Sequence, residues 1–174
     1  MAADAKGNLF VADSQNHAIR KITTNGVVTT FAGQLGVAGS ANGTGTAARF
    51  DSPCGLAFDK AGNLYVSDTG NGLIRKITSA GAVTTIAGVA GASGFLNGAV
   101  ASAQFNAPLG IAVAPNGAVF VADSGNHCIR KISGGAVSTF AGSPQVWGSA
   151  DGKGVSAQFN GPVGLAFEAA RTCL

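Results

Sequence analysis

The chain has 174 residues, of which 27 are glycine, 46% are hydrophobic and only 11% are charged. This composition suits short buried strands joined by tight turns and argues against long helices. The net charge is +3, but six of the 11 Lys and Arg residues lie in repeated Arg-Lys pairs rather than in one basic run, which argues against a nucleic-acid or anionic-membrane surface.

The first predicted element, "GNLFVADSQNHAIRKI" at residues 7–22, places Asp13, Ser14 and His17 close together, as a hydrolytic site would. The same pattern recurs at residues 62–77 and 117–132, with a constant spacing of 55 residues between copies. The second copy has Gly72 in place of the histidine. A catalytic group is needed only once, so these residues are predicted to serve turns and strands, and no catalytic residue is assigned.

Each repeat contains four apolar segments, here named A to D, separated by glycine-rich hairpin turns such as "KAG" and "SAG". Side chains on both faces of the segments are apolar, so each sheet must be covered on both faces. Four-stranded antiparallel meanders stacked around an axis meet that demand, which predicts an all-β β-propeller. In the second copy the segments are residues 53–59, 62–68, 73–79 and 82–88.

The connections from D to the next A are long and glycine-rich, and loops of this length carry function or disorder. Each ends in "AARF" or "SAQF", which predicts a short helical turn anchored by Phe50, Phe105 or Phe159. Trp147, the only tryptophan, lies in the third loop, where we expect it to pack against the loop or mark a contact surface.

Cys54, Cys128 and Cys173 have no CxxC spacing and form no cluster with the two histidines, so neither a metal site nor a cofactor is predicted. The start "MAADAKGN" lacks the features of a signal peptide, and no window is apolar enough for a membrane span. A soluble chain is expected, with the compartment and any removed export signal left open.

The pattern "P-x-G-[LI]-A", "GNLYVSD", "NHxIRKI" and "VxTFAG" resembles the NHL repeat of six-bladed β-propellers from Gly7 to Glu168. The resemblance implies protein-binding or RNA-binding modules, extracellular sensors, or relatives of metal-dependent lyases and hydrolases, and the fold does not choose among them. The predicted blade units are residues 7–52, 53–107 and 108–161, followed by an innermost strand at 162–168.

An aspartate closes each segment B, and an arginine lies seven positions later in segment C, where a hairpin brings the two together. We expect a charge-assisted structural pin in each blade. The alternative is that the three arginines bind anionic ligands. The predicted pins are Asp13–Arg20, Asp68–Arg75 and Asp123–Arg130.

Asp51, Asn106 and Asn160 stand just before segment A, each two residues ahead of a proline. Innermost strands start near the axis, so these side chains are candidate ligand-binding residues at the mouth of the channel. Their oxygens suit a hard cation or a polar small molecule. The plainer interpretation is an Asx turn before the proline, and a single carboxylate among the three does not indicate a bound divalent cation.

These features favour a non-enzymatic module that presents its loops to a protein, a glycan or a small ligand. The alternative is a metal-assisted lyase or hydrolase at the channel mouth, although the chain offers only two histidines and one glutamate. RNA binding ranks lower, because most aromatic residues fall at core positions.

The predicted strand order is BCD, ABCD, ABCD, A. Three blades cannot close a ring, which takes about four to eight. We therefore expect a two-fold homodimer forming a six-bladed ring, in which the terminal A strand of each chain completes the first blade of the other. The alternative is that the chain is a piece of a longer propeller.

Overall fold

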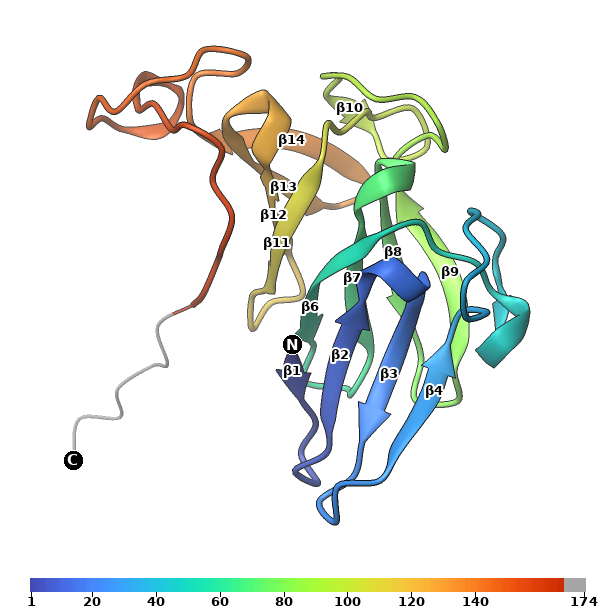
Figure 1. The fold of residues 1–174 in the computed structure, drawn as a ribbon. Coiled ribbons are helices and arrows are strands. Elements are labelled where there is room, and N and C mark those ends of the chain that lie inside the picture. Colours follow the sequence, from blue (N-terminus) through green and yellow to red (C-terminus); the bar gives the residue numbers. More distant parts are fainter. Residues whose placement is uncertain (168–174) are drawn as a thin grey trace, which may run out of the picture.

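The structure, a computed structural model, describes residues 1–167 and consists of three antiparallel sheets that follow one another in an arc (Figure 1). The first sheet has the order β1-β2-β3-β4. Its hairpins are built from adjacent chain segments, so the local sequence pattern specifies them. Its strands are β1 (Ala2–Ala3), β2 (Leu9–Asp13), β3 (Ala18–Ile22) and β4 (Val28–Ala32).

The second and third sheets each contain a meander of four strands, as predicted, and one further strand of two residues at the outer edge. The second sheet holds β6 (Pro53–Phe58), β7 (Leu64–Asp68), β8 (Leu73–Ile77), β9 (Ala82–Ala87) and the short β5 (Gly43–Thr44). The third holds β11 (Pro108–Val113), β12 (Val119–Asp123), β13 (Cys128–Ser133), β14 (Ala136–Ala141) and the short β10 (Gly98–Ala99).

The short strands β5 and β10 belong to the loops between blades, so each loop crosses to the outer edge of the sheet that follows it. β5 pairs with β9, and β10 pairs with β14. Strands of two residues carry no hydrophobic period, which is why the sequence did not predict them. A short helical turn is present in the first and third loops as η2 (Gly45–Ala47) and η5 (Gly154–Ser156). It ends at the first residue of "AARF" or "SAQF" and so lies slightly earlier than predicted.

The N-terminal end corrects one prediction, because the first sheet does not begin with segment B. Strand β1 pairs with β2 through Ala2 opposite Phe10 and Ala3 opposite Leu9. This is the register that places Ala57 opposite Tyr65 and Phe58 opposite Leu64 in the second sheet. Residues 2–3 therefore occupy the last two places of an innermost strand.

The C-terminal segment follows the path of an innermost strand, but no strand of the described residues pairs with it. The Ser124 hydroxyl donates to the Pro162 carbonyl, as the Thr69 hydroxyl does to Pro108 in the blade before. Phe167 packs edge-to-face on Phe120, with ring centroids 5.3 Å apart. Residues 162–167 are not in a strand, and the last residue of the predicted strand, at position 168, lies outside the described residues.

The core lies between adjacent sheets rather than inside any one of them. Phe10 packs edge-to-face against Phe31 at 5.0 Å and against Phe58 at 5.1 Å, which joins the first sheet to the second. A second cluster around Phe105 and Ile111 joins the second sheet to the third. Both faces of the middle sheet are thus covered, as the two-sided apolar pattern requires.

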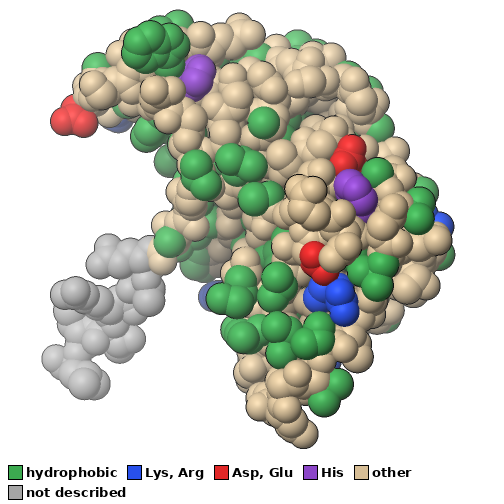
Figure 2. Space-filling view, in the orientation of Figure 1, with side chains coloured by type: hydrophobic (Ala, Val, Ile, Leu, Met, Phe, Trp, Pro, Cys, Tyr) green, Lys and Arg blue, Asp and Glu red, His purple; other side chains and the backbone are tan. Residues whose placement is uncertain are grey.

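The two outer faces of the arc carry apolar side chains that no neighbouring blade covers in the described part of the chain. Val83 of the middle sheet is 2% exposed, whereas Val28, at the same place in the first sheet, is 50% exposed. Phe140 at the other end is 54% exposed. Figure 2 shows hydrophobic side chains gathered over the first sheet.

The motif glycine of the innermost strands permits a close approach between blades. A Cβ atom on Gly55 would collide with the Leu109 carbonyl oxygen, and one on Gly110 with that of Val163. Only glycine allows the backbones to come this near. Within residues 1–167, no helix is long and apolar enough to cross a membrane.

Candidate functional site

The loop face is defined here as the side of the arc formed by the three D-to-A loops and the turns η1 (Ser14–Asn16), η3 (Thr69–Asn71) and η4 (Ser124–Asn126). The loops rest on these turns through backbone hydrogen bonds, such as Gly36 N–H to the Asn16 carbonyl at 3.0 Å and Gly91 N–H to that of Asn71 at 3.3 Å. All candidate site residues of the sequence lie on or directly beneath this face.

The Asp68 carboxylate is the centre of the network in the middle blade. Its Oδ2 accepts from Arg75 Nη1 at 2.8 Å and from Asn71 Nδ2 at 2.9 Å. Its Oδ1 accepts from the Asp51 N–H at 2.7 Å. The carboxylate therefore ties strand β8, the turn η3 and the start of the innermost strand to one point.

Arg75 extends this network to the loop that precedes its own blade. Its Nη1 also donates to the Arg49 carbonyl at 3.1 Å, and its Nη2 donates to the Ala41 carbonyl at 3.1 Å and to Asn42 Oδ1 at 3.0 Å. The guanidinium thus holds a loop from outside its own meander. It is fully buried and cannot reach an anionic ligand in solution.

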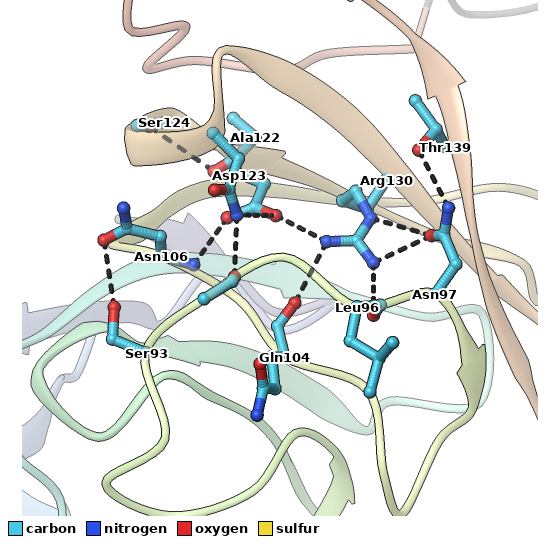
Figure 3. A network of polar contacts seen from close by, with 12 residues as sticks. Ser93, Leu96, Asn97, Gln104, Asn106, Ala122, Asp123, Ser124, Arg130 and Thr139 are labelled. Atoms are coloured by element: carbon cyan, nitrogen blue, oxygen red, sulfur yellow. Dashed lines mark hydrogen bonds and ion pairs between the residues drawn. The ribbon is translucent and has the colours of Figure 1, made fainter. Parts of the chain in front are cut away.

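The third blade repeats this arrangement (Figure 3). Asp123 Oδ2 accepts from Arg130 Nη1 at 2.6 Å, and its Oδ1 accepts from the Asn106 N–H at 2.8 Å. Arg130 also donates to the carbonyls of Gln104 at 3.0 Å and Leu96 at 2.8 Å. Its remaining hydrogen bonds are to Asn97 Oδ1, from Nη2 at 2.8 Å and from Nε at 3.2 Å.

Burial raises the pKa of both central carboxyl groups, because it penalises the charged form. Three hydrogen bonds oppose this for Asp68, from the Asp51 N–H, Asn71 and Arg75. Asp123 likewise has its raised pKa opposed by its own hydrogen-bond donors and by the charge of Arg130. The pairs are therefore desolvated and enclosed, which suits a structural role.

Arg20 in the first blade lacks these loop contacts. It pairs with Asp13 at 3.1 Å, and the two side chains are 25% and 27% exposed. Within residues 1–167 its guanidinium binds no loop carbonyl; its Nε is buried without a partner, as is that of Arg75. The three predicted pairs all form ion pairs in the structure, but only two of them also clamp a loop.

The two histidines bind loop backbone. His17 Nδ1 accepts from the Ser52 N–H at 3.1 Å, and His127 Nδ1 accepts from the Gly161 N–H at 3.1 Å. Both have left-handed backbones, with φ of 53° and 56°. Because Nδ1 is the acceptor, it carries no proton in this arrangement, and each ring fixes the entry to the next innermost strand.

The candidate channel-mouth residues Asp51 and Asn106 stand two residues before β6 and β11, and Asn160 stands at the same place before the C-terminal segment. No hydrogen bond joins the three within the described chain. Asp51 Oδ1 accepts from the Ser52 hydroxyl at 3.0 Å and lies 3.4 Å from His17 Nδ1. Asn106 Oδ1 accepts from the Ser93 hydroxyl at 3.1 Å. Asn160 is exposed. Their role as a ligand site remains a prediction.

Sequence reasoning missed the asparagines of the turns. Asn71 Nδ2 bridges the Asp68 carboxylate and the Gly39 carbonyl at 2.7 Å, and Asn126 Nδ2 makes the equivalent bond to Gly94 at 2.9 Å. Their recurrence in every repeat was a signal that would have identified them. Among residues 1–167, no three His, Cys, Asp or Glu side chains gather where they could hold a metal ion.

Two sequence comparisons agree with the repeat analysis. The NHL repeat family model matches residues 50–77 and 105–132. The chain is 33% identical over 134 residues to NHL repeat-containing protein 2 of Bos taurus, covering 71% of this chain and 18% of that protein. It is 33% identical over 132 residues to Protein SUPPRESSOR OF QUENCHING 1, chloroplastic, of Arabidopsis thaliana, covering 71% of this chain and 12% of that protein.

Solved structures show the same fold. A structural genomics protein of unknown function from Bacteroides thetaiotaomicron has a TM-score of 0.76 at 29% identity, over 94% of this chain and 40% of that chain. An auxiliary nutrient binding protein from the same organism has a TM-score of 0.71 at 20% identity, over 97% of this chain and 42% of that chain. The chain thus spans under half of these structures and under a fifth of the curated relatives.

The family match, the curated relatives and the repeated antiparallel sheets lead to one assignment. The chain belongs to the NHL-repeat family of β-propeller proteins.

Proposed function

We propose that the protein is a non-enzymatic binding module whose recognition surface is the loop face. The observation that supports this is that charged and titratable side chains of the repeat take part in the hydrogen-bond network that holds the loops. Asp68 and Arg75 are both buried, and the histidines accept hydrogen bonds from backbone. The loops they hold are ordered, and a surface of ordered loops suits binding of a protein, a glycan or a small ligand.

We infer that three blades close into a six-bladed ring by pairing with a second copy of the chain. Within residues 1–167, Arg20 holds no loop as its equivalents do, and no arginine holds the third loop. Gln158 N–H donates to the Ala150 carbonyl at 2.9 Å, as Gln104 N–H does to that of Leu96 at 3.2 Å. By this match Asp151 is equivalent to Asn97. In the dimer its carboxylate would therefore lie opposite Arg20 of the partner chain.

The apolar end faces support the same assembly. Val28 on the first sheet and Phe140 on the third are half exposed, whereas the blade interfaces inside the arc are closed. By the repeat, each end face is equivalent to one side of an interface between two neighbouring blades. Two copies related by a two-fold axis bury both end faces of each chain, and an open arc buries neither.

Strand exchange is the finer part of this proposal. By the register that sets Leu56 opposite Val66, Leu165 of one chain would pair with Val11 of the other. Ala2 and Ala3 already occupy the places next to Phe10 and Leu9. The C-terminal segment of one chain can therefore pair fully with β2 of the other only if β1 leaves its place beside β2.

Light scattering on a size-exclusion column tests the assembly. We expect a mass of twice 17.0 kDa for the chain, and a monomer after deletion of residues 161–174. A folded chain that runs at 17.0 kDa across the accessible concentration range would contradict the dimer.

A thermal-shift screen with divalent metals, glycans and small metabolites tests the binding role. A ligand that binds only the folded state must raise its apparent stability. We expect stabilisation by a ligand without any need for a divalent metal. Metal-dependent turnover of a hydrolase or lyase substrate, lost on chelation, would contradict the non-enzymatic assignment.

A further inference from the structure

At one position of the turn between segments B and C, the middle repeat lacks a side chain that both outer repeats carry. His17 and His127 fill this position in the outer blades, and Gly72 fills it in the middle blade. All three residues have the same left-handed backbone, with φ of 53°, 56° and 64°. The middle blade therefore keeps the backbone conformation of its neighbours at this position and lacks the imidazole there.

The hydrogen-bond partner of the missing imidazole is still present. In the outer blades each histidine accepts from the backbone N–H of Ser52 or Gly161 at 3.1 Å. Ala107 is the equivalent residue of the middle blade, with φ of 47° as in Ser52. Within the described chain, the Ala107 N–H has no hydrogen-bond acceptor.

A cavity of about 320 Å³ opens at this place, between η3 and the loop that carries Ala107. Its wall is formed by glycines and small neutral polar residues, and no charged side chain lines it. Asn106 is in the wall, with Oδ1 engaged by Ser93 and Nδ2 free to donate within the described residues. The cavity thus combines hydrogen-bond donors with uncharged walls.

We propose that this cavity binds a small planar nitrogen heterocycle of the imidazole class, whose unprotonated ring nitrogen accepts from the Ala107 N–H. The ligand takes the place that His17 and His127 fill in the neighbouring blades, and the Asn106 amide donates to its polar substituents. The neutral wall favours an uncharged ligand over an ionised one. This inference rests on the proposed binding role of the loop face and assigns a ligand class to it.

Titration of the 15N-labelled chain with imidazole above the pKa of the free ring, followed by amide NMR, tests the site. We expect saturable shifts of the Ala107 and Gly72 amides, with a dissociation constant on the order of 1 to 10 mM for so small a probe. Pyrrole has the same size but no acceptor nitrogen, so it should leave both amides unchanged.

Two variants provide matched controls. Gly72→His supplies the residue that the outer blades carry on the same backbone, and it should abolish the imidazole response. His127→Gly should create a second site, in which the Gly161 amide shifts with imidazole. Amide spectra without ligand verify that both variants remain folded.

The proposal is overturned if no saturation occurs, if pyrrole acts like imidazole, or if Gly72→His responds like the natural sequence. In these cases the cavity holds water alone. A metabolite from the thermal-shift screen that still shifts other loop-face amides would then leave the proposed function standing, so the two failures are distinguishable.

Discussion

Arg75 Nη1 donates to Asp68 Oδ2 over 2.8 Å, and neither side chain is exposed. The same guanidinium binds the carbonyl of Ala41, which lies 34 residues earlier in the chain. A single ion pair thus joins the hairpin of one blade to the loop that leaves the previous blade. The arrangement recurs at Arg130 and Asp123.

We expect Asp68→Ala to lower the free energy of unfolding by about 3 to 5 kcal/mol, because it leaves the buried Arg75 charge without its partner. Lys60→Ala is the control, since Lys60 is exposed and should change stability by less than about 0.5 kcal/mol. Urea denaturation measures both variants. Equal midpoints would show that the buried pair contributes nothing beyond a surface charge.

The proposed dimer places Arg20 of one copy against Asp151 of the other. Arg20→Glu should therefore weaken association at least tenfold, because a repulsive pair replaces an attractive one. Adding Asp151→Arg to the same chain should recover part of the loss. Sedimentation or light scattering across a dilution series follows both variants. If the double variant associates no better than the single one, the two residues do not meet.

The motif glycines give a second test of the ring. Gly164 has open space where a Cβ would be, whereas a Cβ on Gly55 would meet the Leu109 backbone. Gly55→Ala should destabilise the fold by about 1 to 3 kcal/mol, the usual cost of overpacking. In the proposed ring Gly164 would face the innermost strand of the partner's second blade.

Gly164→Ala should accordingly leave the stability of the monomer unchanged and weaken its association. Denaturation at low protein concentration and light scattering at high concentration separate the two effects. A variant that dimerises like the natural sequence would argue against the exchanged strand.

The cysteines differ in reactivity for a physical reason. Burial, with a contribution from the Asp123 charge, raises the pKa of Cys128 to about 12, whereas Cys54 is exposed. The thiolate is the reactive form, so iodoacetamide at pH 8 should modify Cys54 and spare Cys128. Mass spectrometry of a Cys173→Ser chain measures this. Modification of both thiols at equal rates under native conditions would mean that the third blade opens readily.

The sequence alone determined the features that depend on neighbours along the chain. The repeat period and the apolar alternation predicted the meanders, and the expected segment at residues 82–88 became strand β9 at Ala82–Ala87. The pairing of Asp68 with Arg75 follows from hairpin register, because seven residues bring the end of one strand beside the next. Such features are local, so the sequence of one hairpin is enough to specify them.

Tertiary structure decided what happens between blades. The loop clamp of Arg75 on Ala41, the edge strand β5 and the cavity beside Gly72 join segments far apart in sequence. No residue pattern marks them, because a backbone carbonyl or N–H is the same in every residue type. Only the packing of one sheet on the next brings the Ala107 N–H to the place that lacks an imidazole. The same turn is therefore a structural brace in the first and third blades and a candidate binding site in the middle blade.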